Sequence, residues 1–196
     1  MCLPVDADDT LVYQEVKSAE QEAEFQQNIS SIYQWSKRWK MPFNEEKAQL
    51  LLLFGETCTP TVVNYKLGNT TIKRVEETKY PGVILQQDLC FDSHIDSKIA
   101  SARELLEAIK FMLHDATMDG KTLAYTSLCR PILEYADVMW DPVCKQTINA
   151  LAKVQTEAVK FIANLRGQTS VTEVRERLEL ELLAKRRKKT QTVISD

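Results

Sequence analysis

Two adjacent aspartates near the N-terminus are the residues of this sequence best suited to chemistry. Asp8 and Asp9 end the short polar stretch 7–9, and the residues on both sides within Leu3–Val16 favour β-strands. A tight turn of this kind can present two carboxylates to divalent metal ions, which activate a hydroxyl and neutralise a triphosphate. Mg²⁺ suits such a site because it prefers few carboxylates together with substrate oxygens. The alternative is that both aspartates are solvated turn residues.

The first half of the chain predicts short strands and one helix. From Ser18 to Arg38, apolar residues recur near the helical period, and this apolar stripe extends to Trp39 with Trp35 at its flank. Met41-Pro42 is expected to stop the helix, because proline disfavours a helical conformation at the preceding residue. Strands are expected at 49–54, 61–66, 70–75 and 78–85, with a hairpin turn at 67–69.

The second half predicts helices from Ser93 onward. Residues 93–96 fit a capping box, and Asp119-Gly120 is expected to break the helix behind it. A second helix is expected over 121–136, kinked or divided at Pro131. Two more follow, over 145–165 and from a capping box at 170–173 into the C-terminal basic residues. We therefore expect a mostly helical α+β fold with an incomplete antiparallel sheet packed on the 18–38 helix, and a boundary near residue 92.

Several segments, in the same order along the chain, resemble the reverse transcriptases of LINE-type (non-LTR) retrotransposons. Residues 7–13 resemble the central palm motif, in which Ala-Asp-Asp follows an aromatic residue. Residues 39–47 resemble the segment in which a helix ends in Trp and is followed by Phe-Asn and a Lys. Residues 78–83 resemble the Tyr-Leu-Gly-Val hairpin of the primer grip, and 130–135 and 140–142 resemble the thumb and connection.

This resemblance implies roles for particular residues. Asp8 and Asp9 would hold Mg²⁺ in the catalytic site, and Lys47 would lie near the triphosphate as a charge stabiliser or proton donor. Tyr80 and Gly82 would position the primer strand. The partners implied are an RNA template and a DNA primer. Residues 1–92 would be part of a palm with the primer-grip hairpin, and residues 93–196 a helical, thumb- and connection-like region.

The sequence also departs from the family pattern. Asp6 stands where the family has Tyr or Phe, so like-charge repulsion should raise the pKa of at least one neighbouring aspartate. Pro81 replaces a leucine and lacks a backbone donor. The family's other catalytic aspartate and its fingers precede this motif, and only seven residues precede Asp8. We therefore expect a fragment of an RNA-directed DNA polymerase that is inactive alone and binds Mg²⁺ weakly.

Positive charge gathers near the C-terminus of an otherwise acidic chain with a net charge of -3. This basic run could contact nucleic-acid phosphates, act as a nuclear-localisation patch, or be a solvated helix end that complements the helix dipole. Tyr125, Tyr135 and Trp140 are spaced like core residues of packed helices, which favours packing over base stacking. The basic run consists of Lys185, Arg186, Arg187, Lys188 and Lys189.

Composition narrows the remaining possibilities. Five widely spaced cysteines without a CxxC pair argue against a zinc finger or a disulfide framework. No segment resembles a signal peptide, and the longest apolar run, Leu50–Phe54, is too short to span a membrane, so an intracellular protein of the cytoplasm or nucleus is expected. The alternative function is a non-catalytic nucleic-acid-binding or helical protein-interaction module derived from such an element. An exposed palm surface would then favour oligomers or aggregates.

Overall fold

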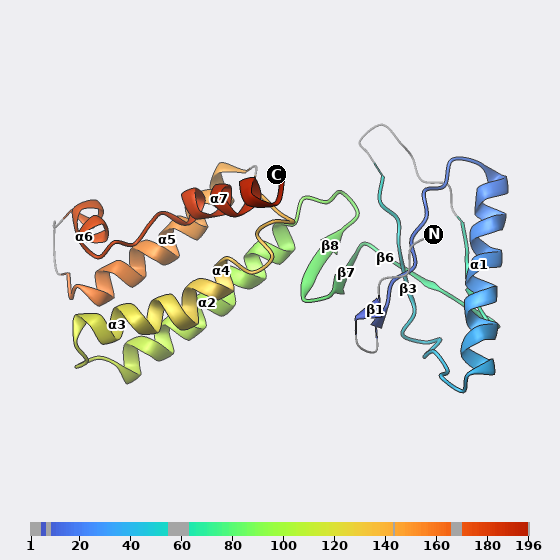
Figure 1. Cartoon of the computed structure of the whole chain (residues 1–196), viewed down its shortest axis with the longest axis horizontal. Coiled ribbons are helices and arrows are strands. Elements are labelled where there is room, and N and C mark those ends of the chain that lie inside the picture. The colour runs from blue at the N-terminus through green and yellow to red at the C-terminus, as the bar shows by residue number, and fades with distance from the viewer. Residues whose placement is uncertain (1–4, 7–8, 55–62, 143, 166–169, 196) are drawn as a thin grey trace. The chain divides into compact units, whose positions relative to one another are not determined.

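The chain divides into two compact units, Met1–Leu89 and Cys90–Asp196. The computed structural model describes residues 5–6, 9–54, 63–142, 144–165 and 170–195 (Figure 1). Helices predominate over short paired strands, which confirms the mostly helical α+β class with an incomplete sheet. Each unit has a hydrophobic cluster of its own.

The first unit is built around one long helix. Helix α1 spans Ala19–Arg38, close to the range 18–38 that the sequence predicted, and the Ser18 hydroxyl caps it by accepting a hydrogen bond from the Gln21 N–H. The helix ends at Trp39, and Lys40 then takes a left-handed conformation with φ 56°. The chain therefore leaves the helix before Pro42, which is not needed to stop it.

The strands of this unit pair two by two. β1 (Val5–Asp6) pairs with β2 (Asp9–Thr10), β4 (Lys66–Leu67) with β5 (Thr70–Thr71), and β7 (Glu77–Tyr80) with β8 (Val83–Gln86), all antiparallel. β3 (Gln49–Leu51) pairs with β6 (Lys73–Val75) in parallel, whereas the sequence predicted antiparallel strands. A parallel pair needs a long connection, and residues 52–72 supply it.

Apolar side chains hold α1 against these strands. The buried members of the cluster are Phe25 and Ile29 of α1 with Tyr65 and Leu67 near β4. The rings of Phe25 and Tyr65 meet edge to face with their centroids 5.1 Å apart, an arrangement that aromatic quadrupoles favour. The Gln26 side chain adds two hydrogen bonds to the backbone of Lys66, at 2.8 and 2.9 Å. The β4–β5 hairpin is therefore fixed to the middle of α1.

All the regular secondary structure that is described in the second unit is helical. α2 spans Asp92–Met112, α3 Met118–Ala124, α4 Arg130–Leu133, α5 Lys145–Ile162, α6 Val171–Arg177 and α7 Leu183–Ser195. A π-helical turn, Tyr125–Cys129, joins α3 to α4. The inner faces of α2 and α5 supply most of the buried cluster, which also includes Tyr125 and Trp140. Core packing is thus confirmed for those two aromatics, whereas Tyr135 is 43% exposed.

Three expectations about the helix boundaries in this unit are wrong. α2 begins before Ser93, at an N-cap, Phe91, that is left-handed (φ 58°) and makes no side-chain capping bond. Gly120 lies inside α3 instead of ending α2, because Thr117 caps a new helix and accepts the Gly120 N–H. The last helix is divided, since Glu179 takes a left-handed conformation (φ 53°) between α6 and α7. Ser170 does cap α6, as predicted.

Candidate functional site

The acidic turn lies on a short antiparallel hairpin. Asp6 of β1 is paired with Asp9 of β2, and Val5 with Thr10, so strands do flank the predicted turn. Asp8 lies outside the described residues. Val12 packs against the hydrophobic cluster of the first unit, and the Asn28 amide of α1 donates to Gln14 at 3.2 Å. The segment that follows the hairpin is therefore attached to α1.

Lys47 lies at the end of a tight turn before β3. The Asn44 side-chain oxygen accepts the N–H groups of Glu46 (3.1 Å) and Lys47 (3.3 Å), and the Asn44 carbonyl also accepts the Lys47 N–H. Asparagine favours such turns because its short side chain bonds the backbone a few residues on. The Lys47 side chain is exposed, and among the described residues no ion pair involves it.

Glu45, inside the same turn, ties it to two other elements. Its carboxylate accepts the Tyr33 hydroxyl of α1 at 2.5 Å and the Thr70 hydroxyl of β5 at 2.8 Å. These hydrogen bonds, Tyr33 first, lower the pKa of Glu45 because they stabilise its charged form. Glu45 was not among the functional residues predicted from the sequence, and only its place beside the expected Phe-Asn and Lys positions could have suggested it. The turn that carries Lys47 is therefore anchored at both α1 and β5.

Tyr80 and Gly82 belong to one hairpin. Tyr80 ends β7 and is paired with Val83, the first residue of β8, so Pro81 and Gly82 form a two-residue turn. Gly82 has φ 80°, the left-handed conformation that the third position of a type II turn requires, and proline is common just before it. Pro81 and Gly82 therefore make a turn within the segment 78–85, where the sequence predicted a strand. Val83 is buried and Tyr80 half-buried, so the hairpin has an inner face.

The five basic residues near the C-terminus do not form one free positive surface. Lys185 and Lys189 lie 3.7 and 2.7 Å from the Glu181 carboxylate, whose pKa is lowered chiefly by the hydrogen bond from Lys189. Arg186 bonds the carboxylate of Glu134 through two nitrogens, with Nη2 3.1 Å from Oε2. Bidentate pairing of this kind fixes direction as well as distance. Four of the five charges are therefore committed inside the second unit or paired on its surface.

Arg187 is the fourth of these and the most buried. Its side chain is 3% exposed, its guanidinium lies 5.6 Å from the Trp140 ring, and Asp141 is 3.9 Å from its Nε. Burial lowers the pKa of Arg187, since a charged group loses its hydration there. Lys188 is exposed, and no ion pair involves it among the described residues. Phosphate contact by this run thus depends on its lysines, because Arg187 is buried and Arg186 is held by Glu134.

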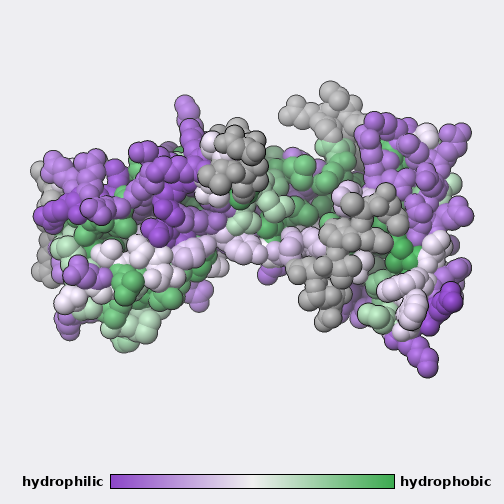
Figure 2. All heavy atoms as spheres, in the orientation of Figure 1, coloured by the Kyte–Doolittle hydropathy of each residue, from purple (hydrophilic) through white to green (hydrophobic). Residues whose placement is uncertain are grey.

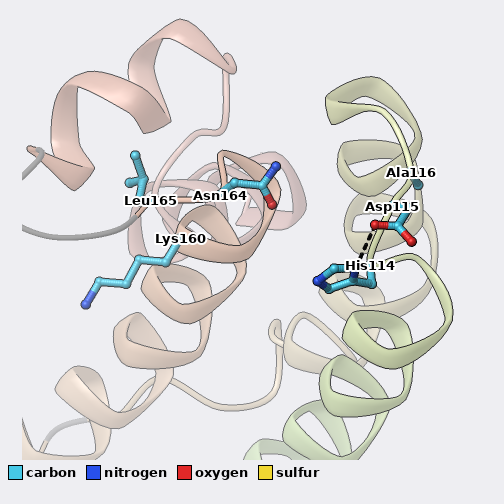
Figure 3. A pocket seen from close by; sticks show the side chains of 6 residues that line it. All are labelled: His114, Asp115, Ala116, Lys160, Asn164 and Leu165. Carbon is cyan, nitrogen blue, oxygen red and sulfur yellow. Dashed lines mark hydrogen bonds and ion pairs between the residues drawn. The ribbon is translucent and has the colours of Figure 1, made fainter.

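A polar cavity of about 530 Å³ lies at one end of the helical unit (Figure 3). His114 and Asp115 form an exposed pair, 2.7 Å apart, on one wall, and Asn164 faces them from the end of α5. The buried Lys121 ammonium donates to Asn164 Oδ1 at 2.9 Å. None of the residues expected to act in catalysis lines this cavity, so it gives those expectations no support.

Two further findings bear on the expected chemistry. In the part of the chain that the structure describes, no three His, Cys, Asp or Glu side chains gather as ligands for a metal ion. Nor is any helix of that part long and apolar enough to cross a membrane. Asp8, one of the two carboxylates expected to hold Mg²⁺, lies outside those residues.

Comparison with known proteins gives two similarities. The chain is 22% identical over 151 residues to the "Probable RNA-directed DNA polymerase from transposon BS" of Drosophila melanogaster, covering 74% of this chain and 17% of that protein. It is 23% identical over 143 residues to the "RNA-directed DNA polymerase from mobile element jockey" of Drosophila funebris, covering 70% of this chain and 15% of that protein. No family model and no solved structure matches it.

The chain thus spans about a sixth of the length of the curated relatives it matches. The similarity extends over most of this chain, and both relatives are RNA-directed DNA polymerases of mobile elements. The resemblance drawn from the sequence motifs, to part of a LINE-type reverse transcriptase, is confirmed.

Proposed function

We propose that this chain is part of the RNA-directed DNA polymerase of a non-LTR retrotransposon and contributes palm and thumb segments to it. The observation that carries the proposal is the similarity to two such polymerases across 70–74% of the chain. The first unit would be the palm part with the primer-grip hairpin β7–β8, and the second a thumb- and connection-like bundle. An RNA template and a DNA primer are the partners this assignment implies.

The proposed metal ligands are Asp8 and Asp9. Their carboxylate oxygens are the donors that Mg²⁺ prefers, and the β1–β2 hairpin is a suitable carrier for such a pair. When bound, Mg²⁺ would lower the pKa of the primer hydroxyl and neutralise charge on the triphosphate. Asp6, paired with Asp9 across the hairpin, adds a third acidic residue to this region.

Lys47 has the proposed role of stabilising charge on the leaving pyrophosphate. Its exposed side chain is free to meet a ligand, while its backbone is held by the Asn44 turn and, through Glu45, by α1 and β5. A fixed backbone with a free ammonium suits a residue that must meet a bound triphosphate repeatedly in the same place. Tyr80 and Gly82 would support the primer at the β7–β8 turn, where the backbone is rigid.

Nucleic-acid contact by the second unit is proposed for the lysines of the basic run. Lys188 is exposed and has no ion pair among the described residues, and Lys185 and Lys189 are exposed although both lie near Glu181. Arg186 and Arg187 have partners inside the unit. Binding through so few charges should be weak and should be lost at moderate salt.

Two measurements on the purified chain test the proposal. The first is binding to an RNA–DNA heteroduplex, and the second is a primer-extension assay with Mg²⁺, dNTPs, an RNA template and a DNA primer. We expect binding at low salt and no incorporation above an Asp8→Ala, Asp9→Ala control, because the relatives are about six times longer than the matched part. Failure to bind the heteroduplex at low salt would contradict the polymerase assignment. Incorporation that the double substitution abolishes would contradict inactivity alone and support the metal ligands.

A helical protein-interaction module is the alternative, and one observation favours it. Large apolar side chains lie exposed on the second unit, with Phe111 86% exposed, Met112 67% and Leu123 66%. Exposed apolar groups of this size are typical of contact surfaces when they adjoin. Loss of self-association or of partner binding in a Phe111→Ser variant, with heteroduplex binding absent, would favour this alternative.

A further inference from the structure

The C-terminal end of α1 carries large aromatic side chains on its surface. Trp35 is 51% exposed and Trp39 62%, and the neighbouring Met41 is 63% exposed. The apolar period of the sequence predicted that Trp39 belongs to the apolar stripe of this helix, and that prediction is wrong. The inner face is formed by Phe25, Ile29 and the completely buried Ser36. Exposed indoles are uncommon because each one leaves a large apolar area in water.

The two indoles are neighbours on a well-defined backbone. The Trp39 N–H donates to the Trp35 carbonyl at 3.0 Å, so the residues are one helical turn apart. Side chains four positions apart start about 5–6 Å from each other on a helix surface. The helix end is closed by a hydrogen bond of 2.9 Å from the Met41 N–H to the Ser36 carbonyl. The two indole-bearing residues therefore lie one turn apart on the same side of the helix.

Positive charges alternate with these aromatic side chains. Lys37, Arg38 and Lys40 are all exposed, and residues 25–44 contain no aspartate or glutamate. The Lys37 ammonium lies 5.0 Å from the Tyr33 ring, and no ion pair among the described residues engages any of the three cations. Around this end of α1, Figure 2 shows near-neutral residues beside hydrophilic ones. The Lys37 charge also helps to lower the pKa of Glu45, so an acidic residue lies within its reach. The surface therefore offers π-faces together with exposed cations that take no part in the ion pairs of the described residues.

We propose that Trp35 and Trp39, with Lys37, Arg38 and Lys40, bind single-stranded nucleic acid. Each indole would stack on an unpaired base, which is worth about 1–3 kcal/mol per base, and the cations would contact the phosphates. The choice of nucleic acid among polyanions rests on the proposed polymerase function. The site itself lies outside the acidic hairpin, the Lys47 turn and the primer-grip hairpin.

Other occupants fit this surface less well. A duplex exposes no base faces to stack on, so it would use the cations alone. An anionic membrane attracts tryptophan and lysine too, but a helix lying on lipid is cationic along its whole polar face. The first turn of α1 instead carries Glu20 and Glu22, and positive charge is confined to the last turn. A base-stacking strand needs only a patch of this size.

Tryptophan fluorescence tests the proposal directly on the whole chain. Titration with a short oligothymidylate should quench the emission of Trp35 and Trp39, while Trp140, 2% exposed, is unable to stack and gives a constant background. Trp35→Ala and Trp39→Ala should each weaken binding about 5-fold to 150-fold, the equivalent of one stacked base. Replacing the three cations with glutamine should reduce the salt slope by about 2, since each phosphate contact contributes about 0.7 for a single strand.

Matched controls separate the surface from general effects. Phe111→Ala removes an even more exposed aromatic, from the other unit, and should leave oligonucleotide affinity unchanged. A duplex of the same length should bind more weakly, and Trp35→Ala should not alter its affinity. Far-UV circular dichroism should be the same for all variants, because every altered side chain is exposed.

Two results would refute the proposal that this surface binds single-stranded nucleic acid. One is oligonucleotide binding that is equal in the native chain and in both tryptophan variants, and the other is stronger quenching by anionic vesicles than by the oligonucleotide. Either outcome leaves the polymerase assignment standing if the heteroduplex still binds elsewhere. Conversely, oligonucleotide binding that depends on the tryptophans, without any heteroduplex binding, would contradict the polymerase assignment and support the single-strand-binding surface.

Discussion

Gly68 offers the sharpest test of how the first unit holds the Lys47 turn. It lies in the β4–β5 turn with φ 62°, and a Cβ added there would be 2.6 Å from Tyr33 Cζ and 2.7 Å from its hydroxyl oxygen. Tyr33 in turn donates to Glu45, which anchors the turn that carries Lys47. Replacing Gly68 with alanine should therefore disturb three elements at once.

The expected cost of Gly68→Ala has two parts. A left-handed conformation costs a residue with a Cβ about 1–2 kcal/mol. Forcing a methyl group into an occupied space costs about 1–3 kcal/mol more, because the Tyr33 ring has to move. Together these predict a loss of about 2–5 kcal/mol in the stability of the first unit. Tyr33→Phe should recover part of the loss in the double variant, since it removes one of the two closest contacts.

Hydrogen exchange read by mass spectrometry can assign this loss to its unit. Peptides covering α1 and β4–β5 should exchange about 30-fold to several thousand-fold faster, whereas peptides of the second unit should not change. Gly120→Ala is the matched control, because its Cβ would meet only ordinary contacts, the nearest at 3.4 Å from Thr117 Oγ1. It should stabilise α3 by about 0.5–1 kcal/mol. Unchanged protection of α1 in Gly68→Ala would refute the anchoring described here.

Three further results are expected. The pKa of Glu45 is lowered in the folded state, so the ionised carboxylate stabilises the fold above pH 4.5 and this stabilisation is lost as the pH falls below that value. The melting temperature of Glu45→Gln should therefore lack the decline on the acid side that the native chain shows. Arg186→Ala should destabilise the second unit by about 1–3 kcal/mol in urea unfolding, because it breaks a bidentate pair with Glu134. Lys188→Ala should change the stability by less than about 0.5 kcal/mol, and equal effects of the two substitutions would contradict a stabilising Arg186–Glu134 pair. Burial raises the pKa of the Cys129 thiol to about 11, so peptide mapping after alkylation at pH 8 should find it unmodified while the exposed Cys90 reacts.

Local patterns predicted the elements of the first unit well. The apolar period gave the approximate bounds of α1, and the strand-forming residues on each side of the acidic turn gave the β1–β2 hairpin. These features depend on neighbours a few residues apart, so the sequence contains all the information they need. The parallel pairing of β3 with β6 could not be predicted from local patterns, because the paired residues are more than twenty positions apart in the sequence.

Helix boundaries in the second unit were harder to predict for the same reason. Ser93-His94-Ile95-Asp96 has the residue types of a capping box, but the chain enters α2 through a left-handed Phe91, and Phe91 packs against the core of the unit. Gly120 reads as a helix breaker, yet the Thr117 cap makes it an early residue of the next helix. In both cases packing and capping by neighbours outweighed the intrinsic preference of one residue.

The sequence by itself determined the family resemblance, the α+β class and the residue types at Asp8, Asp9 and Lys47, because these depend on composition and on order along the chain. The tertiary structure alone decided which charges remain available. It paired Arg186 with Glu134 and buried Arg187, and it left Trp39 at the surface, where the apolar period had predicted burial. Burial of a side chain depends on what packs against it from distant parts of the chain, and periodicity within one helix contains no information about those partners.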